Sequence, residues 1–253
     1  MSSATYPDLA GKRAFVTGGA TGIGASIVRA YAHQGTIVGF VDIDENAGNA
    51  LVSELKDEGL QVWFAPVDVT DTNHLKQAIG DFSAAYGPIA FLVNNVANDT
   101  RHDWRTLTRN SWDAALSVNL TPAFFAIQAV AEGMLERRAG SIVNFGSISW
   151  KAKHGGMPAY TTAKAAIHGM TRSFVSELGS AGVRINTVVP GWVLTERQIA
   201  EHYGADGADI ISRNQPLTGT IKPEHVAALV MFLSSDDSAM CTGQEFTIDG
   251  GWI

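Results

Sequence analysis

A tyrosine and a lysine four residues apart are the first side chains in this sequence that could do acid–base chemistry. Tyr160 and Lys164 stand at i and i+4, so on a helix both project from one face, one turn apart. An ammonium there favours the ionised phenol and is expected to lower the tyrosine pKa from about 10, which gives a general base near neutrality. Ser147 lies thirteen residues upstream, after the apolar run 141–145, where its hydroxyl could hydrogen-bond the reacting oxygen. Since this spacing alone more often means a solvated Tyr/Lys pair, the interpretation depends on the other elements of the chain.

A glycine-rich turn at 17–24, TGGATGIG, predicts a site for phosphate groups. An apolar run at 13–17 is expected to form a strand before it, and a helical pattern follows it. Gly18, Gly22 and Gly24 let the backbone turn tightly, approach a pyrophosphate and pack the helix on the strand. The free N–H groups of the helix N-terminus would then face the phosphates.

The strand predicted after that helix, 36–42, ends in an acid that could select the nucleotide. Asp42 lies 18 residues beyond Gly24, the spacing at which a carboxylate accepts both hydroxyls of an adenosine ribose. A helix-cap or turn role for Asp42 is the alternative. The acid would repel a 2′-phosphate, and neither the glycine-rich turn nor the residues just after Asp42 supply a basic side chain to bind one. The sequence therefore predicts NAD in preference to NADP.

Strand-like and helical patterns alternate along the whole chain without a linker or a repeat. Further strands are expected at 61–69, 89–95, 141–145, 184–189 and 245–251, and helices at 46–59, 74–87, 112–138, 158–179 and 223–235. Strands joined by helices form right-handed crossovers. This predicts an α/β fold, a single-domain Rossmann-like doubly wound parallel sheet of about seven strands with helices on both faces, over residues 1–253. Asp68-Val69 and Asn94-Asn95 then lie at the carboxyl ends of strands, where such sheets bind ligands.

Composition and charge argue against several classes of partner. Apolar residues make up 45% of the chain and charged residues 17%, which is ordinary for a globular protein. The net charge of −7 and the pI near 5.4, without any Lys/Arg cluster, argue against nucleic acid and anionic membrane. No apolar run is expected to approach the roughly 20 residues of a membrane span, and the first residues lack the apolar segment of a secretory signal, so a cytoplasmic location is expected. Cys241 is the single cysteine and no Cys/His set has zinc spacing, so neither a disulfide nor a metal is expected.

Together these motifs resemble those of the short-chain dehydrogenase/reductase family over essentially the whole chain. The matches are TGGATGIG for the family's TGxxxGxG, Asp68-Val69 for its adenine-contacting pair, Asn94-Asn95 for its NNAG, then Asn119, Ser147, Tyr160-x-x-x-Lys164, and Pro190-Gly191 followed by Thr195. One departure is Ala97, which stands where the family usually has glycine. Its β-carbon removes backbone freedom beside the cofactor and leaves the conformation of that loop open.

The resemblance implies a role for each matching residue. Tyr160 is implied as the acid/base, with Lys164 lowering its pKa and holding the nicotinamide ribose. Ser147 would orient the reacting oxygen, and Asn119 would anchor a water that relays the proton, although an Asn in a helix is more often a surface or kink residue. Hydride would pass directly between substrate carbon and nicotinamide, without a metal. The implied cofactor-binding residues are Gly18, Thr21, Gly22, Ile23, Gly24, Asp42, Ile43, Asp68, Val69, Asn95, Tyr160, Lys164, Pro190, Gly191, Val193 and Thr195.

Four segments, 98–104, 144–150, 188–198 and 234–252, are similar to the sugar dehydrogenases of this family, which oxidise pentoses or hexoses such as L-arabinose, D-galactose and D-xylose at the anomeric carbon. A pyranose presents several hydroxyls and an apolar ring face, so its pocket needs bidentate polar groups and a flat aromatic wall. The residues implied to bind substrate are Asn98, Ser147, His154, Tyr160, Trp192 and Gln198. Each loop residue has an alternative role. For Asn98 and Gln198 the alternative is to hold their loops in place without contacting the substrate. Trp192 could be core, and His154 could be solvated.

The leading interpretation is an NAD-dependent aldose 1-dehydrogenase, in which Tyr160 deprotonates the C1 hydroxyl as hydride leaves and an aldonolactone forms. A ketoreductase or secondary-alcohol dehydrogenase of the same family would share every catalytic residue, and a catalytically silent NAD-binding sensor is a third interpretation. The accepted epimer stays open because the stretch 195–216, expected to be a substrate-loop insertion, is the hardest to interpret. The resemblance also implies pairing through the helices 112–138 and 158–179 into a homotetramer.

Overall fold

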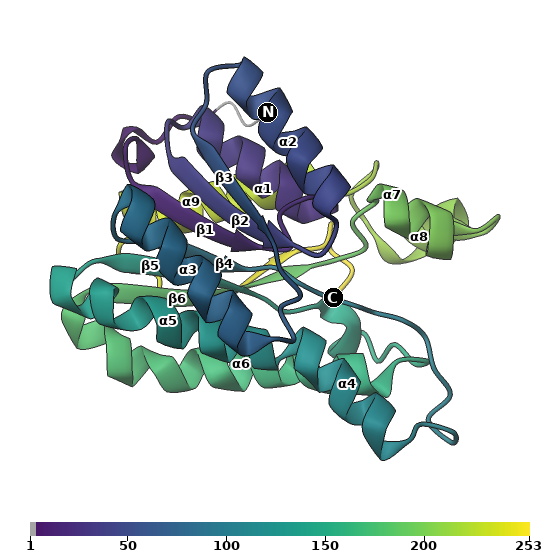
Figure 1. The fold of residues 1–253 in the computed structure, drawn as a ribbon. Helices are drawn as coiled ribbons and strands as arrows, with labels where there is room; N and C mark the ends of the chain where they lie inside the picture. The colour runs from purple at the N-terminus through teal and green to yellow at the C-terminus, as the bar shows by residue number, and fades with distance from the viewer. Residues whose placement is uncertain (1–3) are drawn as a thin grey trace.

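The computed structural model describes residues 4–253 and is built on a seven-stranded parallel sheet (Figure 1). The strand order is β3-β2-β1-β4-β5-β6-β7, and every neighbouring pair is parallel. The strands are β1 (Arg13–Thr17), β2 (Ile37–Asp42), β3 (Val62–Pro66), β4 (Phe91–Asn94), β5 (Gly140–Phe145), β6 (Val183–Pro190) and β7 (Glu245–Ile248). The order reverses between β1 and β4, which is where a doubly wound sheet opens a crevice at the carboxyl ends of its strands. The predicted fold class is confirmed.

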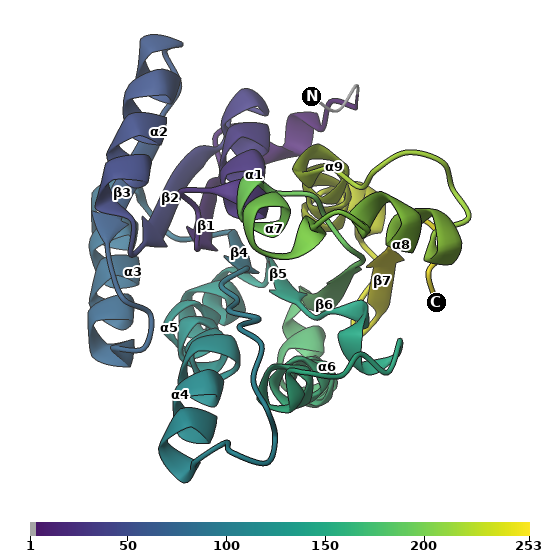
Figure 2. The ribbon, with the colours of Figure 1, turned by 90° about the vertical axis from the view of Figure 1, so that its right-hand side faces the viewer.

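Helices cover both faces of the sheet, as Figure 2 shows. On one face lie α1 (Gly22–His33), α2 (Glu45–Asp57) and α9 (Pro223–Ser234), and on the other lie α3 (Thr72–Tyr86), α5 (Thr121–Arg137) and α6 (Pro158–Leu178). Each face has its own apolar core. Tyr31, Phe40 and Val230 are fully buried in the first, and Phe82, Ile127 and Ile185 are buried in the second. Burial on both faces explains the nearly continuous apolar runs of the strands.

Side chains cap the N-termini of α2 and α3, whereas no side chain caps the N-terminus of α1. Asp44 caps α2 by accepting the N–H of Ala47 at 3.0 Å, and Asp71 caps α3 by accepting the N–H of His74 at 3.0 Å. Such a cap stabilises a helix by about 1 kcal/mol. Thr21 precedes α1, but its side chain caps no N–H group. The first-turn N–H groups of α1 therefore stay available to an anion.

Two helices replace the single long helix predicted over 112–138. α4 (Arg109–Asn119) ends where Leu120 leaves helical geometry, at φ −132° and ψ −55°, and α5 begins directly after it. Pro122 lies in the first turn of α5, where the N–H that proline lacks would have no helical partner. The break therefore falls where the second helix can start without losing a hydrogen bond.

The same pair of helices corrects the expectation about membrane spans. Within Arg109–Arg137 an 18-residue window reaches a mean hydropathy of 1.5, which is enough for a membrane span by length and composition alone, so the expectation that no run would come close was wrong. A third of that window is buried inside the protein, where α4 packs on α6 and α5 packs on α3. A core helix of a globular protein passes the same test.

The stretch 195–216 contains short helical elements rather than one open loop. These are α7 (Glu196–Gln198), a π-helical turn at Ile199–Tyr203 and α8 (Gly207–Asn214), and α7 and α8 lie on the side of α1 and α9 (Figure 2). The last strand ends earlier than predicted, at Ile248, because Gly250 and Gly251 adopt φ of +66° and +92° and turn the chain.

Candidate active site

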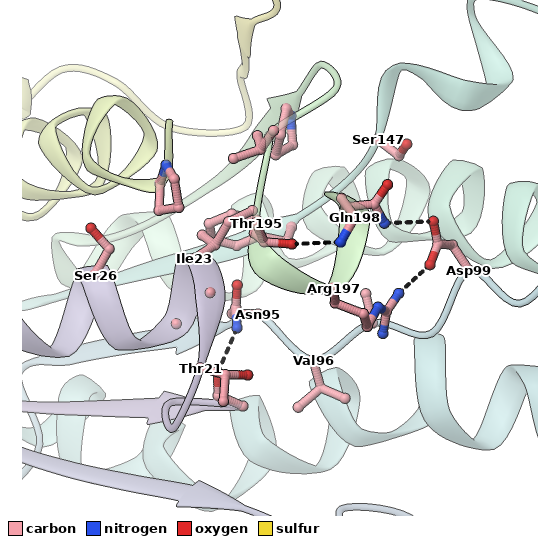
Figure 3. Close-up of a pocket in the computed structure, with 18 of the residues that line it drawn as sticks. Thr21, Ile23, Ser26, Asn95, Val96, Asp99, Ser147, Thr195, Arg197 and Gln198 are labelled. Atoms are coloured by element: carbon pink, nitrogen blue, oxygen red, sulfur yellow. Dashed lines mark hydrogen bonds and ion pairs between the residues drawn. The ribbon is translucent and has the colours of Figure 1, made fainter. Parts of the chain in front are cut away.

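The glycine-rich turn between β1 and α1 forms one end of a long cleft at the carboxyl ends of the strands. A β-carbon on Gly24 would lie 1.7 Å from the carbonyl oxygen of Gly18, so only glycine fits there. Gly22 has φ +54°, and a methyl carbon of Thr195 stands 3.1 Å from where its β-carbon would be. Asn95 Nδ2 donates to the Gly18 carbonyl at 2.9 Å and ties the end of β4 to the turn (Figure 3). The turn is held close to the uncapped N–H groups of α1, which is the arrangement that a pyrophosphate needs.

Asp42 ends β2 beside that turn and is half-buried. Its Oδ2 accepts the N–H of Ala20 at 3.0 Å, and its Oδ1 accepts the N–H of Asp44 at 3.1 Å. The turn role that the sequence left as the alternative is therefore present. The carboxylate also lines the cleft, and the lone pairs that the two N–H groups do not use are free for ribose hydroxyls. Its neighbour Ile43 is 73% exposed at the same end of the cleft.

The other residues predicted to bind the cofactor lie along the same cleft. Asp68 turns the chain after β3, because its Oδ1 accepts the N–H of Thr70 at 2.9 Å and the Thr70 hydroxyl at 2.8 Å. At the opposite side of the sheet Gly191 follows β6 and donates its N–H to the Ile248 carbonyl at 2.9 Å. The predicted cofactor residues that line the cleft are Gly18, Thr21, Gly22, Ile23, Gly24, Asp42, Ile43, Asp68, Val69, Asn95, Tyr160, Lys164, Pro190, Gly191, Val193 and Thr195.

Tyr160 and Lys164 meet the middle of the cleft from one face of α6, as their spacing predicts. Lys164 is 2% exposed, and its Nζ donates to the Phe145 carbonyl at 3.0 Å and lies 5.9 Å from the centroid of the Tyr160 ring. Ser147 follows β5 and accepts the N–H of Ser149 at 3.1 Å, which fixes its turn. Its hydroxyl also interacts with the Tyr160 phenol. The structure thus brings the three predicted catalytic side chains together.

Burial shifts the pKa values of Tyr160 and Lys164 in opposite directions. It raises the pKa of Tyr160 to about 12, although the hydrogen bond from Ser147 acts in the opposite direction. Burial also lowers the pKa of Lys164 to about 8. The carboxylate of Asp99 raises both values by its charge. The prediction that the tyrosine pKa is lowered towards neutrality was wrong for this structure, because the loss of solvation outweighs the Ser147 hydrogen bond and the charges of Arg101 and Arg197.

Asn119, the last residue of α4, is 3% exposed and binds the loop that follows β4. Its Oδ1 accepts the N–H of Asn98 at 2.8 Å, and its Nδ2 donates to the carbonyls of Asn98 at 3.0 Å and Ala115 at 2.9 Å. It lines a small cavity behind the main cleft together with Lys164. Asn119 therefore anchors a loop of the cleft, and its part in a proton relay stays a prediction.

Beyond Ser147 the cleft is lined by indole rings and polar groups. Trp192 Nε1 donates to Gln198 Oε1 at 3.0 Å. Gln198 Nε2 donates to Asp99 Oδ2 at 3.1 Å (Figure 3). Trp252 stands beside Trp192, with ring centroids 6.4 Å apart. Trp192 and Gln198 therefore face the cleft at the predicted end, and Gln198 also ties its loop to the one after β4.

Asn98 and His154 line the same end but are engaged differently. Asn98 Oδ1 accepts the N–H and the hydroxyl of Thr100 at 3.0 and 2.6 Å, so this side chain ties down its own loop. The His154 ring lies against Trp252, with centroids 6.0 Å apart, and partial burial together with the charge of Arg101 lowers its pKa. Contact of either residue with a substrate stays a prediction.

Four residues at this end were missed by the sequence analysis: Asp99, Arg197, His202 and Trp252. Arg197 binds Asp99 Oδ1, and His202 Nε2 lies 3.8 Å from Asp99 Oδ2. Trp252 is held by Asp249, whose carboxylate accepts two backbone N–H groups of the last three residues at 2.8 and 2.9 Å. Asp99, Arg197 and Trp252 are inside segments that resemble sugar dehydrogenases, and His202 is inside the stretch 195–216. A loop sequence does not say which of two adjacent polar side chains faces a cleft.

Comparisons with known proteins agree with this geometry. The family model described as "Enoyl-(Acyl carrier protein) reductase" matches residues 18–253. The chain is 44% identical over 252 residues to a D-xylose 1-dehydrogenase of Caulobacter vibrioides, with 100% of both chains covered. It belongs to the short-chain dehydrogenase/reductase family. The "Probable galactose dehydrogenase GalD" of Rhizobium meliloti is 38% identical, with 99% of this chain and 98% of that one covered.

Solved structures of other short-chain dehydrogenases/reductases share the fold. A blue fluorescent protein from a metagenomic library, in complex with NADPH, matches with a TM-score of 0.89 and 32% identity over 96% of this chain and 98% of that one. A 3-oxoacyl-[acyl-carrier protein] reductase from Brucella melitensis matches with a TM-score of 0.91 and 27% identity over 100% and 98%. The protein is therefore an oxidoreductase with an NAD(P)-binding fold.

The departure of this short-chain dehydrogenase/reductase from the family's glycine at position 97 is tolerated by its backbone. Among residues 4–253 the non-glycine residues with positive φ are Arg138 and Lys153, so Ala97 adopts an ordinary conformation. A β-carbon there is free of backbone strain. The question that the sequence left open is thus answered in favour of a regular loop.

Proposed function

We propose that the protein is a cytoplasmic, NAD-dependent aldose 1-dehydrogenase, which oxidises the anomeric C1 hydroxyl of a pentose or hexose pyranose to the aldonolactone. The observation that carries the proposal is the chain from Trp192 through Gln198 to Asp99, which sets an amide and a carboxylate beside an indole ring in the same cleft as Ser147 and Tyr160. A pyranose offers matching hydroxyls and an apolar ring face. The relatives named D-xylose 1-dehydrogenase and galactose dehydrogenase support the same substrate class.

A bound NAD would supply the acceptor for the hydride of the substrate carbon. Tyr160 receives the proton of the C1 hydroxyl, and Ser147 holds the reacting oxygen beside the phenol. Lys164 would hold the nicotinamide ribose and would stabilise the phenolate by its charge. Asn119 fixes the loop after β4 and supports the water through which the proton leaves. The stretch 195–216 closes over the sugar as the substrate loop.

The cofactor in this proposal is NAD rather than NADP because of Asp42. A 2′-phosphate would bring like charges within a few ångströms in a half-buried site, and a repulsion of about 3 kcal/mol, or about a hundredfold in kcat/KM, is expected. The glycine-rich turn and the residues just after Asp42 contain no basic side chain. A solved relative in complex with NADPH shows that the fold also accommodates the phosphate, so the choice depends on this position.

The experiment that tests the function is NADH and NADPH formation across a panel of aldoses and simple secondary alcohols. Aldose turnover with NAD supports the proposal. Turnover of secondary alcohols without any aldose supports the alternative, a ketoreductase or secondary-alcohol dehydrogenase. NAD binding without turnover of any compound supports a silent sensor.

The cofactor assignment is tested by Asp42→Ala and Asp42→Asn. Both variants remove the charge, so NADP efficiency should rise and NAD efficiency should fall. Asp42→Asn is the matched control for the turn, because its amide oxygen can still accept one of the N–H groups of Ala20 and Asp44 that the carboxylate binds. Equal efficiency of the wild-type protein with NAD and NADP would contradict the proposal that Asp42 selects NAD.

A homotetramer built through α4, α5 and α6 is part of the same proposal. α5 carries two large apolar side chains with exposed surface, Phe124 at 41% and Leu135 at 37%. Pairing of these helices between subunits would bury them. Sedimentation equilibrium that finds only a 26.9 kDa species would contradict it.

A further inference from the structure

Asp99 occupies a fixed position at the substrate end of the cleft. The N–H and carbonyl of the preceding residue, Asn98, are both bound by the buried Asn119, at 2.8 and 3.0 Å. The Asp99 side chain is 15% exposed and lines the cleft. Its position is therefore set by the fold and not by its own flexibility.

The carboxylate of Asp99 is only partly used by its neighbours. Arg197 donates to Oδ1, and Gln198 Nε2 donates to Oδ2 at 3.1 Å. The amide of Gln198 cannot turn round without loss, because its Oε1 already accepts the Trp192 indole N–H. His202 Nε2 at 3.8 Å and Arg101 at 4.0 Å are too distant for hydrogen bonds.

The Asp99 carboxylate has acceptor positions that its neighbours do not fill. An ionised carboxylate accepts about four hydrogen bonds. Among the residues that the structure describes, Arg197 and Gln198 fill two of these positions. A carboxylate in a cleft that still lacks donors is a strong site for hydroxyl groups.

We propose that Asp99 determines substrate specificity by accepting hydrogen bonds from two neighbouring hydroxyls of the sugar, while Arg197 and Gln198 hold its carboxylate in place. This inference rests on the proposed aldose dehydrogenase function. Tyr160 and Lys164 line the same cleft, and the Asp99 charge is near enough to affect both of their pKa values. A sugar held at C1 by Tyr160 therefore extends its other hydroxyls towards this carboxylate.

A purely structural role would look different in one respect. If Asp99 only joined the loop after β4 to α7, its removal would weaken every substrate by the same factor. If Asp99 binds hydroxyls, kcat/KM of the wild-type protein falls when one of those hydroxyls is deleted from the sugar. In a variant without the carboxylate the same deletion has little effect. The two roles are separated by deleting the hydroxyl and the carboxylate in turn.

The experiment measures kcat/KM for the best aldose and for each of its monodeoxy analogues with the wild-type protein, Asp99→Asn and Asp99→Ala. In the wild-type protein, removal of a hydroxyl that Asp99 binds should reduce kcat/KM by about tenfold to a hundredfold. In Asp99→Ala the same deletion should change kcat/KM by no more than about twofold. The effect should be confined to two adjacent positions of the ring.

Asp103→Asn is the matched control, because Asp103 belongs to the same loop but is half exposed and pairs with Arg105 outside the cleft. It should leave the dependence on every hydroxyl unchanged. Asp99→Asn, which keeps the shape of the side chain, carries the comparison if Asp99→Ala does not fold. If each deoxy sugar loses the same factor in kcat/KM in the variants as in the wild-type protein, the inference is overturned and the proposed function stays intact. Absence of aldose turnover in the wild-type protein would instead overturn the proposed function itself.

Discussion

Lys164→Met tests whether the lysine that the chemistry needs destabilises the fold. The side chain is 2% exposed, and burial lowers its pKa from 10.5 to about 8. A change of this size corresponds to about 3 kcal/mol of stability lost at neutral pH, because folding must bring a charge out of water. Methionine has a similar length and no charge, so it removes this penalty.

The sign of the effect follows from the two pKa values. Below pH 8 the lysine is protonated in the folded and the unfolded protein, and the full penalty applies. Between about pH 8 and pH 10.5 the unfolded chain binds one more proton, so the free energy of unfolding of the wild-type protein rises by about 1.4 kcal/mol per pH unit relative to Lys164→Met. The carbonyl of Phe145 loses its donor in the variant and costs about 1 to 3 kcal/mol at every pH.

Urea unfolding of both proteins at about pH 7, 8 and 9.5 measures how the difference between their free energies of unfolding changes with pH. The cost of the lost hydrogen bond to Phe145 is the same at every pH and does not affect this change. Between about pH 8 and pH 9.5 the free energy of unfolding of the wild-type protein should rise by about 2 kcal/mol relative to that of the variant. Lys56→Met, on the exposed face of α2, is the matched control and should show no such change. Unfolding free energies of wild type and Lys164→Met that run parallel over this range would refute the reasoning. The variant should also have little activity and weaker NAD binding.

Three further substitutions test single contacts. Tyr160→Phe should lower turnover by about 10² to 10⁴ with NAD binding intact, measured by steady-state kinetics and NAD titration, and near-normal turnover would remove its role as the base. Gly24→Ala should abolish dinucleotide binding, because its β-carbon would lie 1.7 Å from the Gly18 carbonyl, whereas Gly80→Ala, with open space around it in α3, should bind NAD normally. Asn119→Leu loses three buried hydrogen bonds and should lower the free energy of unfolding by about 3 kcal/mol in urea; a loss below about 1 kcal/mol would contradict its role as a loop anchor.

The sheet and the face of α6 could be predicted because local patterns decide them. Apolar runs buried on both sides and helices between them leave a parallel sheet as the arrangement that satisfies every strand. The i, i+4 spacing places Tyr160 and Lys164 on one face of any helix. The carboxyl ends of β3 and β4 follow from the sheet direction, so Asp68 and Asn95 were placed correctly in the cleft.

The rest depends on contacts that no local pattern contains. The break at Leu120 was missed because α4 and α5 have the same apolar period, and proline at a first turn looks like proline in a helix that continues. The pKa of Lys164 depends on how completely the sheet and the loop after β4 cover it. The choice of Asp99 over Asn98 depends on Asn119, which holds the backbone between them and sets the direction of each side chain.

The position of α6 on the sheet explains how three catalytic side chains from different elements stay aligned. Asn94 Nδ2 donates to Asn144 Oδ1 at 2.8 Å, and Asn144 Nδ2 donates to the Thr171 hydroxyl at 3.0 Å. Thr171 lies eleven residues after Tyr160, three turns along the same face of the helix. A slip of the helix by one turn would leave the buried Nδ2 of Asn144 without its partner on α6, at about 1 to 3 kcal/mol. Because Asn144 is also part of β5, which ends just before Ser147, the same hydrogen bonds that fix α6 fix the distance between the serine and the tyrosine.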